Sequence, residues 1–192
     1  GNEKQDSGTL STPKGYRIGA LEQHIHFTQT TVLAECIQAL PVEKQWDHYK
    51  AEIILSGLGF SEQDFHKDPA TFSGGYQVRI NLCKALLASP NMLLLDEPTN
   101  YLDILSLRWL KEYLNNWPGE MMLITHDRDF MDKVTTHTLG IHRKKAKKVK
   151  GDTIKFYEQI VQEEEAYELT RKNMETKRKE MQSLVDRFRA KA

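Results

Sequence analysis

Short apolar runs alternate with amphipathic stretches along most of the chain. Asn91 to Leu95 is a largely unalternating apolar run, which predicts a strand buried on both faces of a parallel sheet. Met121 to Ile124 predicts a second buried strand, and Tyr16 to Leu21 a shorter strand that leads to Gln23. Because strands alternate with helices, we expect an α/β fold with helices packed on a parallel sheet.

Helical periodicity fills the spaces between these strands. The helical pattern from Thr31 to about Leu55 is broken at Pro41, and a polar connector, Ser61 to Thr71, follows it. Ser73 and Asp103 are each expected to cap a further helix. The predicted core positions on these two helices are Val78, Leu82, Ala85, Leu86, Leu105, Trp109, Leu110 and Leu114.

The pattern changes after the helix that is predicted to run through Phe130 and Val134. Further strands are predicted at Thr136 to Ile141 and Lys148 to Ile154, around a basic turn. From Phe156 onward the chain is helical, with neither Gly nor Pro. One apolar residue recurs every seven positions, whereas a coiled-coil seam has two apolar positions in each heptad. We therefore expect a mostly solvated helix that packs one edge against a single partner. The stripe consists of Ile160, Tyr167, Met174, Met181 and Phe188.

Composition indicates one ordinary domain, expected at residues 1–155, followed by the long charged helix at 156–192. Of the 192 residues, 39% are hydrophobic and 28% charged, with 27 basic and 27 acidic side chains, which excludes a uniformly basic nucleic-acid-binding protein. No signal sequence or membrane-spanning run is present, so we expect a cytoplasmic protein. Cys83 is expected to pack as a small hydrophobic residue; a disulfide with Cys36 is disfavoured but stays open.

Two adjacent carboxylates follow the predicted strand that ends at Leu95. In open α/β sheets, ligands bind beyond the carboxyl ends of the strands, where Asp96 and Glu97 would lie. Asp96 is a candidate ligand for a Mg²⁺ ion that bridges nucleotide phosphates, and Glu97 a candidate general base, stiffened by Pro98. The alternative is a pair of acids in an ordinary turn, which the whole string from Leu93 to Asn100 disfavours.

Three weaker signals surround this pair. Ser73, Gly74 and Gly75 would expose the first N–H groups of a helix to an anion, although a Ser-Gly-Gly turn is more often only a cap. His126 follows a strand and could donate to a phosphate, unless its neighbour simply caps a helix. Gln23 also follows a strand, with an amide able to touch metal and water. A metal site formed by Glu22, His24 and His26 is disfavoured.

The order of these elements resembles the ATP-binding-cassette (ABC) superfamily, from about Gly8 to Ala192. Asp96 to Asp103 and Thr125 to Phe130 are similar to the ABC-F branch; transporter subunits more often have Ser-Ala where this chain has Asn100-Tyr101. The ending from Asp186 to Ala192 resembles the linker between the two cassettes of ABC-F proteins. The resemblance implies a partial P-loop NTPase fold with a helical signature subdomain.

The resemblance also implies roles for the candidate residues. Asp96 would hold Mg²⁺ and Glu97 would be the catalytic base. His126 would be the switch histidine, and Gln23 the glutamine that contacts metal and water. The signature motif, which contacts ATP held by the opposite cassette, would consist of Ser73, Gly74 and Gly75. Asp103 would be the D-loop aspartate.

One departure from the family concerns the phosphate-binding loop. No Gly-Lys-Ser or Gly-Lys-Thr occurs in the chain, whereas Asp6 to Thr9 resembles the segment that comes directly after that loop in the family, so we expect truncation rather than degeneration. Phe72 and Tyr76 also vary the commonest signature residues. The chain alone is therefore expected not to hydrolyse ATP appreciably.

For the full-length parent, the resemblance implies an ATPase that works with ATP and Mg²⁺ between two cassettes. Its expected partners are the second cassette, the ribosome and transfer RNA, with no membrane. The basic end of the long helix would contact RNA phosphates, unless it is a charged solvated face. A transporter ATP-binding subunit and a non-catalytic binding module remain alternatives. Housekeeping and antibiotic-resistance roles, nucleotide preference and source organism stay open.

Overall fold

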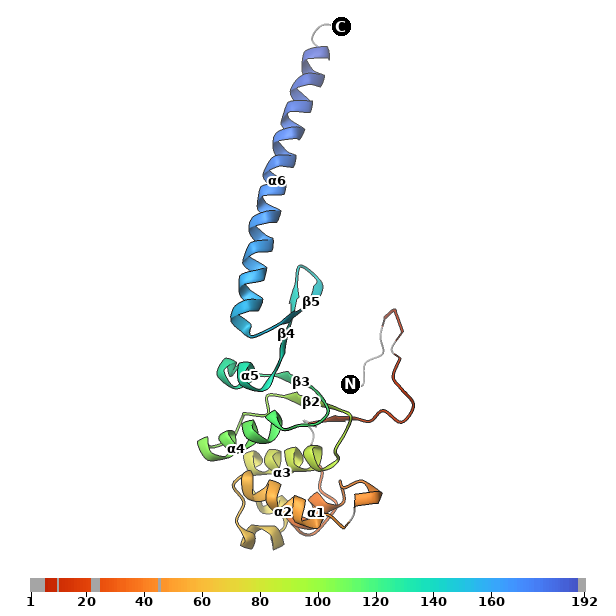
Figure 1. Ribbon diagram of the computed structural model, residues 1–192, viewed down its shortest axis with the longest axis vertical. Helices are drawn as coiled ribbons and strands as arrows, with labels where there is room; N and C mark the ends of the chain where they lie inside the picture. Colours follow the sequence, from red (N-terminus) through yellow and green to blue (C-terminus); the bar gives the residue numbers. More distant parts are fainter. Residues whose placement is uncertain (1–5, 10, 22–24, 45, 190–192) are drawn as a thin grey trace. The chain divides into compact units, whose positions relative to one another are not determined.

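The computed structural model describes residues 6–9, 11–21, 25–44 and 46–189, without the side chains at 184, 185 and 187–189. It consists of two compact units, residues 1–134 and 135–192, and each is described by itself (Figure 1). The fold is α/β with a parallel sheet and a long final helix, as expected. The extents predicted for the ATPase domain and the linker helix, 1–155 and 156–192, stay predictions.

The first unit contains a parallel sheet in the order β1-β2-β3. Asp96, at the end of β2, is in register with Ile124 of β3, so the carboxyl ends of these two strands meet at one edge. The three predicted strands are confirmed, and they are β1 (Ile18–Ala20), β2 (Met92–Asp96) and β3 (Glu120–Ile124).

The helices of the first unit agree with the predicted pattern, apart from three short 3₁₀ helices that the sequence did not indicate. Two of these lie in the expected polar connector. The α-helices are α1 (Val32–Ile37), α2 (His48–Gly57), α3 (Gly74–Leu87), α4 (Ile104–Asn115) and α5 (Arg128–Val134), and the 3₁₀ helices are η1 (Val42–Lys44), η2 (Glu62–His66) and η3 (Pro69–Thr71).

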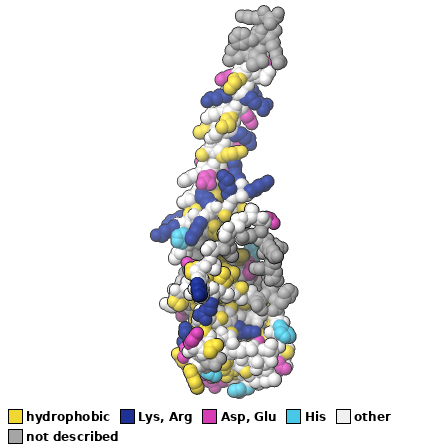
Figure 2. Space-filling model, turned by 90° about the vertical axis from the view of Figure 1, so that its right-hand side faces the viewer, with side chains coloured by type: hydrophobic (Ala, Val, Ile, Leu, Met, Phe, Trp, Pro, Cys, Tyr) yellow, Lys and Arg dark blue, Asp and Glu magenta, His cyan; other side chains and the backbone are white. Residues whose placement is uncertain are grey.

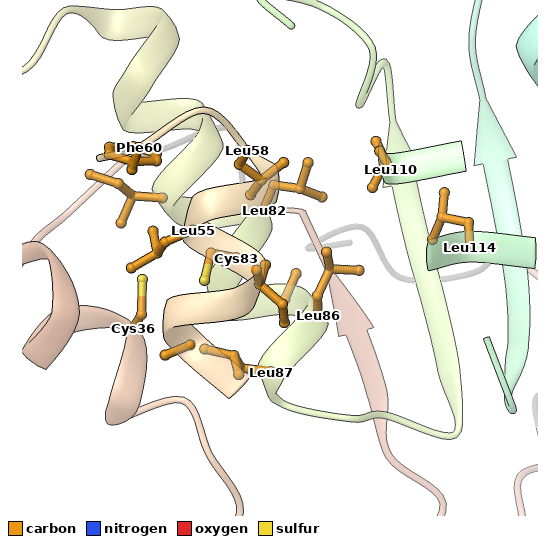
Figure 3. Packing of buried hydrophobic residues seen from close by; sticks show 14 of the residues in the cluster. Cys36, Leu55, Leu58, Phe60, Leu82, Cys83, Leu86, Leu87, Leu110 and Leu114 are labelled. Atoms are coloured by element: carbon orange, nitrogen blue, oxygen red, sulfur yellow. The ribbon is translucent and has the colours of Figure 1, made fainter. Parts of the chain in front are cut away.

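Helix α3 is central to the hydrophobic core of this unit. It packs against α1 and α2, and its buried side chains include Leu82 and Leu86 (Figure 3). Cys36 of α1 and Cys83 of α3 are both buried and both free thiols. Burial, followed by the neighbouring Cys36, raises the pKa of the Cys83 thiol, so this residue behaves as a small apolar side chain, as expected.

Several burial predictions were wrong. Leu105 was expected in the core but is 74% exposed, because it lies on the outer face of α4, whereas Leu110 and Leu114 are buried. Strand β3 is not buried on both faces: Met122 and Ile124 are 44% and 58% exposed. Exposed and partly buried residues alternate along β3, so one face of the strand remains uncovered by the described residues.

The second unit is a β-hairpin followed by a long helix. Strand β4 (His137–His142) pairs antiparallel with β5 (Lys145–Lys150) through a turn in which Arg143 and Lys144 have φ angles of 49° and 63°. Successive left-handed residues suit a two-residue hairpin turn. The second strand starts earlier than predicted, and Ile154 belongs to helix α6 (Thr153–Arg189) instead.

Contacts between α6 and the hairpin cluster near the start of the helix. Phe156 is buried beside Gly140, whose added Cβ would lie 2.2 Å from the phenyl ring. The Arg143 guanidinium donates to both carboxylate oxygens of Glu164 and lies 3.5 Å from the centre of the Tyr167 ring. Further along, Met174 and Met181 are 66% and 67% exposed. Figure 2 shows lysine and arginine side chains between hydrophobic ones along this part of α6.

Candidate functional site

The chain turns sharply where β2 ends. Asp96 is the last residue of the strand and is exposed, and Glu97 follows it with a φ angle of 47°. A positive φ is uncommon for a residue other than glycine and is often found at functional sites. The backbone N–H of Glu97 donates to the carbonyl of Ile124 at 2.8 Å, which anchors this turn to the end of β3.

The Glu97 carboxylate is held by residues that follow β3. Its Oε2 accepts from the Thr125 hydroxyl at 3.3 Å and from the backbone N–H of His126 at 3.4 Å. Its Oε1 lies 3.4 Å from Nε2 of His126, whose imidazole is 99% exposed while the Glu97 side chain is 23% exposed. A second hydroxyl, that of Thr99, lies 3.2 Å from the Thr125 hydroxyl. Both carboxylate oxygens therefore have neighbours among the residues that follow β3.

His126 and its neighbour Asp127 have separate functions. Asp127 accepts the backbone N–H of Phe130 at 3.0 Å and caps α5, which was the simpler explanation of this sequence. That cap leaves the imidazole of His126 outside the helix and beside Glu97. The structure therefore brings together the predicted base and the predicted switch histidine. Their roles in catalysis stay predictions.

Asp103 caps α4, as predicted. Its Oδ1 accepts the backbone N–H of Ser106 at 2.9 Å, and its Oδ2 lies 3.1 Å from Nη1 of Arg79. The backbone hydrogen bond from Ser106 is the main cause that holds the pKa of Asp103 below its usual value; burial opposes it, and Arg79 adds to it. Arg79 was missed from the sequence, although a cation inside an apolar helical stretch was a signal that could have identified it.

The start of α3 lies against the turn after Glu97. Ser73 occupies the N-cap position, but its hydroxyl makes no capping hydrogen bond, contrary to our expectation. A Cβ added to Gly75 would lie 3.1 Å from Cβ of Tyr101, whereas one added to Gly74 would meet no atom within 4 Å. The first N–H groups of α3 have no partners within the helix, so this open end suits an anion.

The residues present fit a magnesium–nucleotide group. Asp96 and Glu97 supply oxygen atoms at one sheet edge, and Mg²⁺ usually binds one or two carboxylates together with phosphate oxygens. Among the described residues, no group of three or more His, Cys, Asp or Glu side chains could hold a metal without such a ligand. Gln23, the remaining predicted contact, lies outside the described residues, as do Glu22 and His24.

Comparison with known proteins gives consistent results. The family model described as "ABC transporter" matches residues 1–100. The chain is 34% identical, over 86% of its length and 23% of the relative, to "ATP-binding cassette sub-family F member 3" of Rattus norvegicus. It is 38% identical, over 74% of its length and 22% of the relative, to "Probable ATP-binding protein YheS" of Haemophilus influenzae. The chain thus spans 20–23% of the length of such relatives.

Solved structures share the fold of this chain. An ATP-binding subunit of an ABC transporter has a TM-score of 0.57 at 20% identity, covering 75% of this chain and 62% of that one. The dimeric cassette MJ0796, bound to ADP and Pi, has a TM-score of 0.53 at 23% identity, covering 70% and 63%. Separately, none of the helices in the described ranges has both the length and the hydropathy of a membrane span.

Proposed function

This chain belongs to the ATP-binding-cassette family, in its ABC-F branch, and from that premise we propose that it supplies the hydrolytic side of one ATP site in a two-cassette protein that acts on the ribosome in the cytoplasm. Family membership makes it part of an ATP-binding ATPase. The observation that carries the proposal is the cluster of Asp96, Glu97 and His126 at the carboxyl ends of β2 and β3.

Glu97 is the proposed general base. Thr125 and the backbone N–H of His126 hold one carboxylate oxygen. The other oxygen lies beside the exposed imidazole of His126 and would accept a proton from an attacking water once the imidazole turns away. The exposed imidazole of His126 is free to rotate toward the γ-phosphate and donate to it. Asp96 would hold Mg²⁺, which when bound neutralises charge on the phosphates.

The start of α3 is proposed to serve the second ATP of the pair. The hydroxyl of Ser73 and the first N–H groups of the helix would contact a γ-phosphate held by the opposite cassette. This arrangement needs two cassettes. Turnover by the 192-residue chain alone at about 1–100 per second, the rate typical of kinases, would contradict it.

Ribosomal RNA or transfer RNA is the proposed contact of α6. Support comes from the ABC-F branch and from the exposed basic residues in the second half of the helix. In the described part of the chain these residues form no ion pairs, whereas Arg171, which precedes them, lies 3.8 Å from Glu175. The residues concerned are Lys172, Lys177, Arg178 and Lys179.

The test replaces Glu97 by Gln, with the matching change in the second cassette, in the complete product of the gene that contains this chain. We expect ATP turnover to fall at least about 100-fold, as for loss of a general base, while ATP binding persists. Co-sedimentation with ribosomes in ATP should rise, because the closed state is retained. Glu112→Gln, on the exposed face of α4, is the control. Unchanged turnover in Glu97→Gln would refute the role of Glu97.

A further inference from the structure

We propose that Arg79 is a positioning residue, which fixes the turn between Glu97 and Asp103 against α3 and so makes the two parts of the site move as one. The inference rests on the proposed function, because it concerns residues assigned to ATP hydrolysis. Arg79 lies on α3, one turn beyond Gly75, and only 6% of it is exposed. Among the described residues its hydrogen bonds go to Leu58, Tyr101 and Asp103, and none goes to Glu97 or Ser73.

The guanidinium connects three separate segments. Nη1 donates to the carbonyl of Leu58 at 2.8 Å, after α2, and lies 3.1 Å from Oδ2 of Asp103. Nε and Nη2 both donate to the carbonyl of Tyr101, at 2.9 and 2.5 Å. A planar guanidinium with five N–H groups can satisfy acceptors in several directions at once, which an ammonium group cannot do.

The surroundings restrict the guanidinium to this position. It lies 4.6 Å from the centre of the Tyr76 ring, which itself packs edge-on against Phe60. On another side is Gly59, with a φ angle of +88°, and a Cβ added there would lie 2.8 Å from Nη1 of Arg79. Any residue larger than glycine at this position would therefore push the guanidinium out of place.

The turn that Arg79 holds is one that needs support. Tyr101 has a φ angle of 66°, a left-handed conformation that a bulky residue rarely adopts unless its surroundings fix it. Its carbonyl receives two of the guanidinium hydrogen bonds, and its Cβ packs beside Gly75. A shift of the turn would therefore displace both Glu97, where the turn begins, and the phosphate-facing start of α3.

The decisive experiment compares Arg79→Lys with Arg108→Lys in the complete gene product. Arg108 lies exposed on α4 and has no hydrogen bond or ion pair within the described ranges. We expect Arg79→Lys to lower kcat for ATP about tenfold, with KM changed less than about twofold, because small misplacements of catalytic groups reduce the chemical step. Arg108→Lys should keep both values. An unchanged kcat in a folded Arg79→Lys protein would overturn the inference.

A second pair of variants covers the case in which Arg79→Lys fails to fold. Gly59→Ala places a methyl group against the guanidinium, whereas Gly15→Ala has a similar positive φ but no atom within 4 Å of the new Cβ. We expect only Gly59→Ala to lower kcat, and equal kcat in the two would overturn the inference. ATP turnover of Glu97→Gln is measured in the same experiment. If Glu97→Gln keeps full turnover, the proposed function fails. If Glu97→Gln loses turnover while the Arg79 and Gly59 variants keep it, only the positioning role is refuted.

Discussion

The carboxylate of Glu35 and the ammonium group of Lys84 form a hydrogen-bonded ion pair across 49 residues of sequence. Glu35 has no exposed surface, and its other oxygen accepts the backbone N–H groups of Thr28 and Gln29, each at 2.9 Å. Burial favours the neutral acid, but the hydrogen bonds from Lys84, Thr28 and Gln29 outweigh it and hold the pKa of Glu35 below its usual value. The pair fixes the segment before α1 to α3.

Lys84→Met should therefore destabilise the fold, because it leaves Glu35 buried without its cation. We expect a loss of about 3 kcal/mol in the free energy of unfolding, measured by urea denaturation at pH 7. The loss should shrink as the pH falls, since Glu35 then takes up a proton. Glu35→Gln/Lys84→Met should recover part of it, because the neutral amide can still accept from Thr28 and Gln29. A double variant as unstable as Lys84→Met, or more so, would show that charge is not the cause.

Gly57→Ala should destabilise the packing of α2 against α4. An added Cβ would lie 2.1 Å from the indole of Trp109, so either the ring or the helix has to shift. The expected cost is about 1–3 kcal/mol, even though alanine favours helix more than glycine does. Ser56→Ala, on the exposed side of the same helix, is the control and should change stability little. Adding Trp109→Leu to Gly57→Ala should relieve the clash, as seen in the midpoint of thermal unfolding.

Asp64 predicts a measurable pH dependence. The hydrogen bond from Lys67, followed by those from the Ser61 hydroxyl and backbone N–H, lowers the pKa of Asp64 from 3.8 to about 2. A carboxyl with a depressed pKa stabilises the folded state above the unfolded value and loses this contribution as the pH falls. The stability difference between wild type and Asp64→Asn should thus be largest above pH 3.8, fall as the pH drops through about 2, and be lost below it. Glu62→Gln, which removes a nearby carboxylate that has no ion pair among the described residues, is the matched control.

The basic half of α6 predicts a salt-dependent affinity for RNA. Replacing Lys172, Lys177, Arg178 and Lys179 by Gln in the 192-residue chain should weaken binding to a double-helical RNA and flatten the dependence of log K on log salt concentration. The slope should change by about one for each phosphate that the variant no longer neutralises. Lys148→Gln/Lys150→Gln, on the hairpin, is the control for total charge. If the hairpin variant weakens binding as much per charge as the α6 variant, binding is not specific to α6.

Local patterns in the sequence identified most of the elements because each pattern reports on a single segment. The apolar run before Asp96 and the cap at Asp103 are of this kind, and both are confirmed by β2 and α4. The short 3₁₀ helices were missed, since three to five residues carry no detectable period. The burial of β3 was overestimated because a sequence does not tell which elements cover each face of a strand.

The candidate site could be predicted only in part, for a similar reason. Strand ends gave Asp96, Glu97 and His126, because residues after parallel strands share one edge of the sheet. Neither Arg79 nor Glu35 was identified, since the function of a buried charge depends on partners far away in the sequence. Gln23, the remaining predicted site residue, lies outside the described residues. The catalytic roles of all these residues remain predictions for the experiments above.

Helix α6 has a mechanical consequence. Its 37 residues, at a rise of about 1.5 Å each, make a rod about 55 Å long. Its contacts with the hairpin lie within the first few turns, up to Tyr167. A rod held at one end magnifies motion: each degree of tilt at the base moves the far end by about 1 Å. A tilt of three degrees at the base, near Phe156, would therefore displace the far end by about 3 Å.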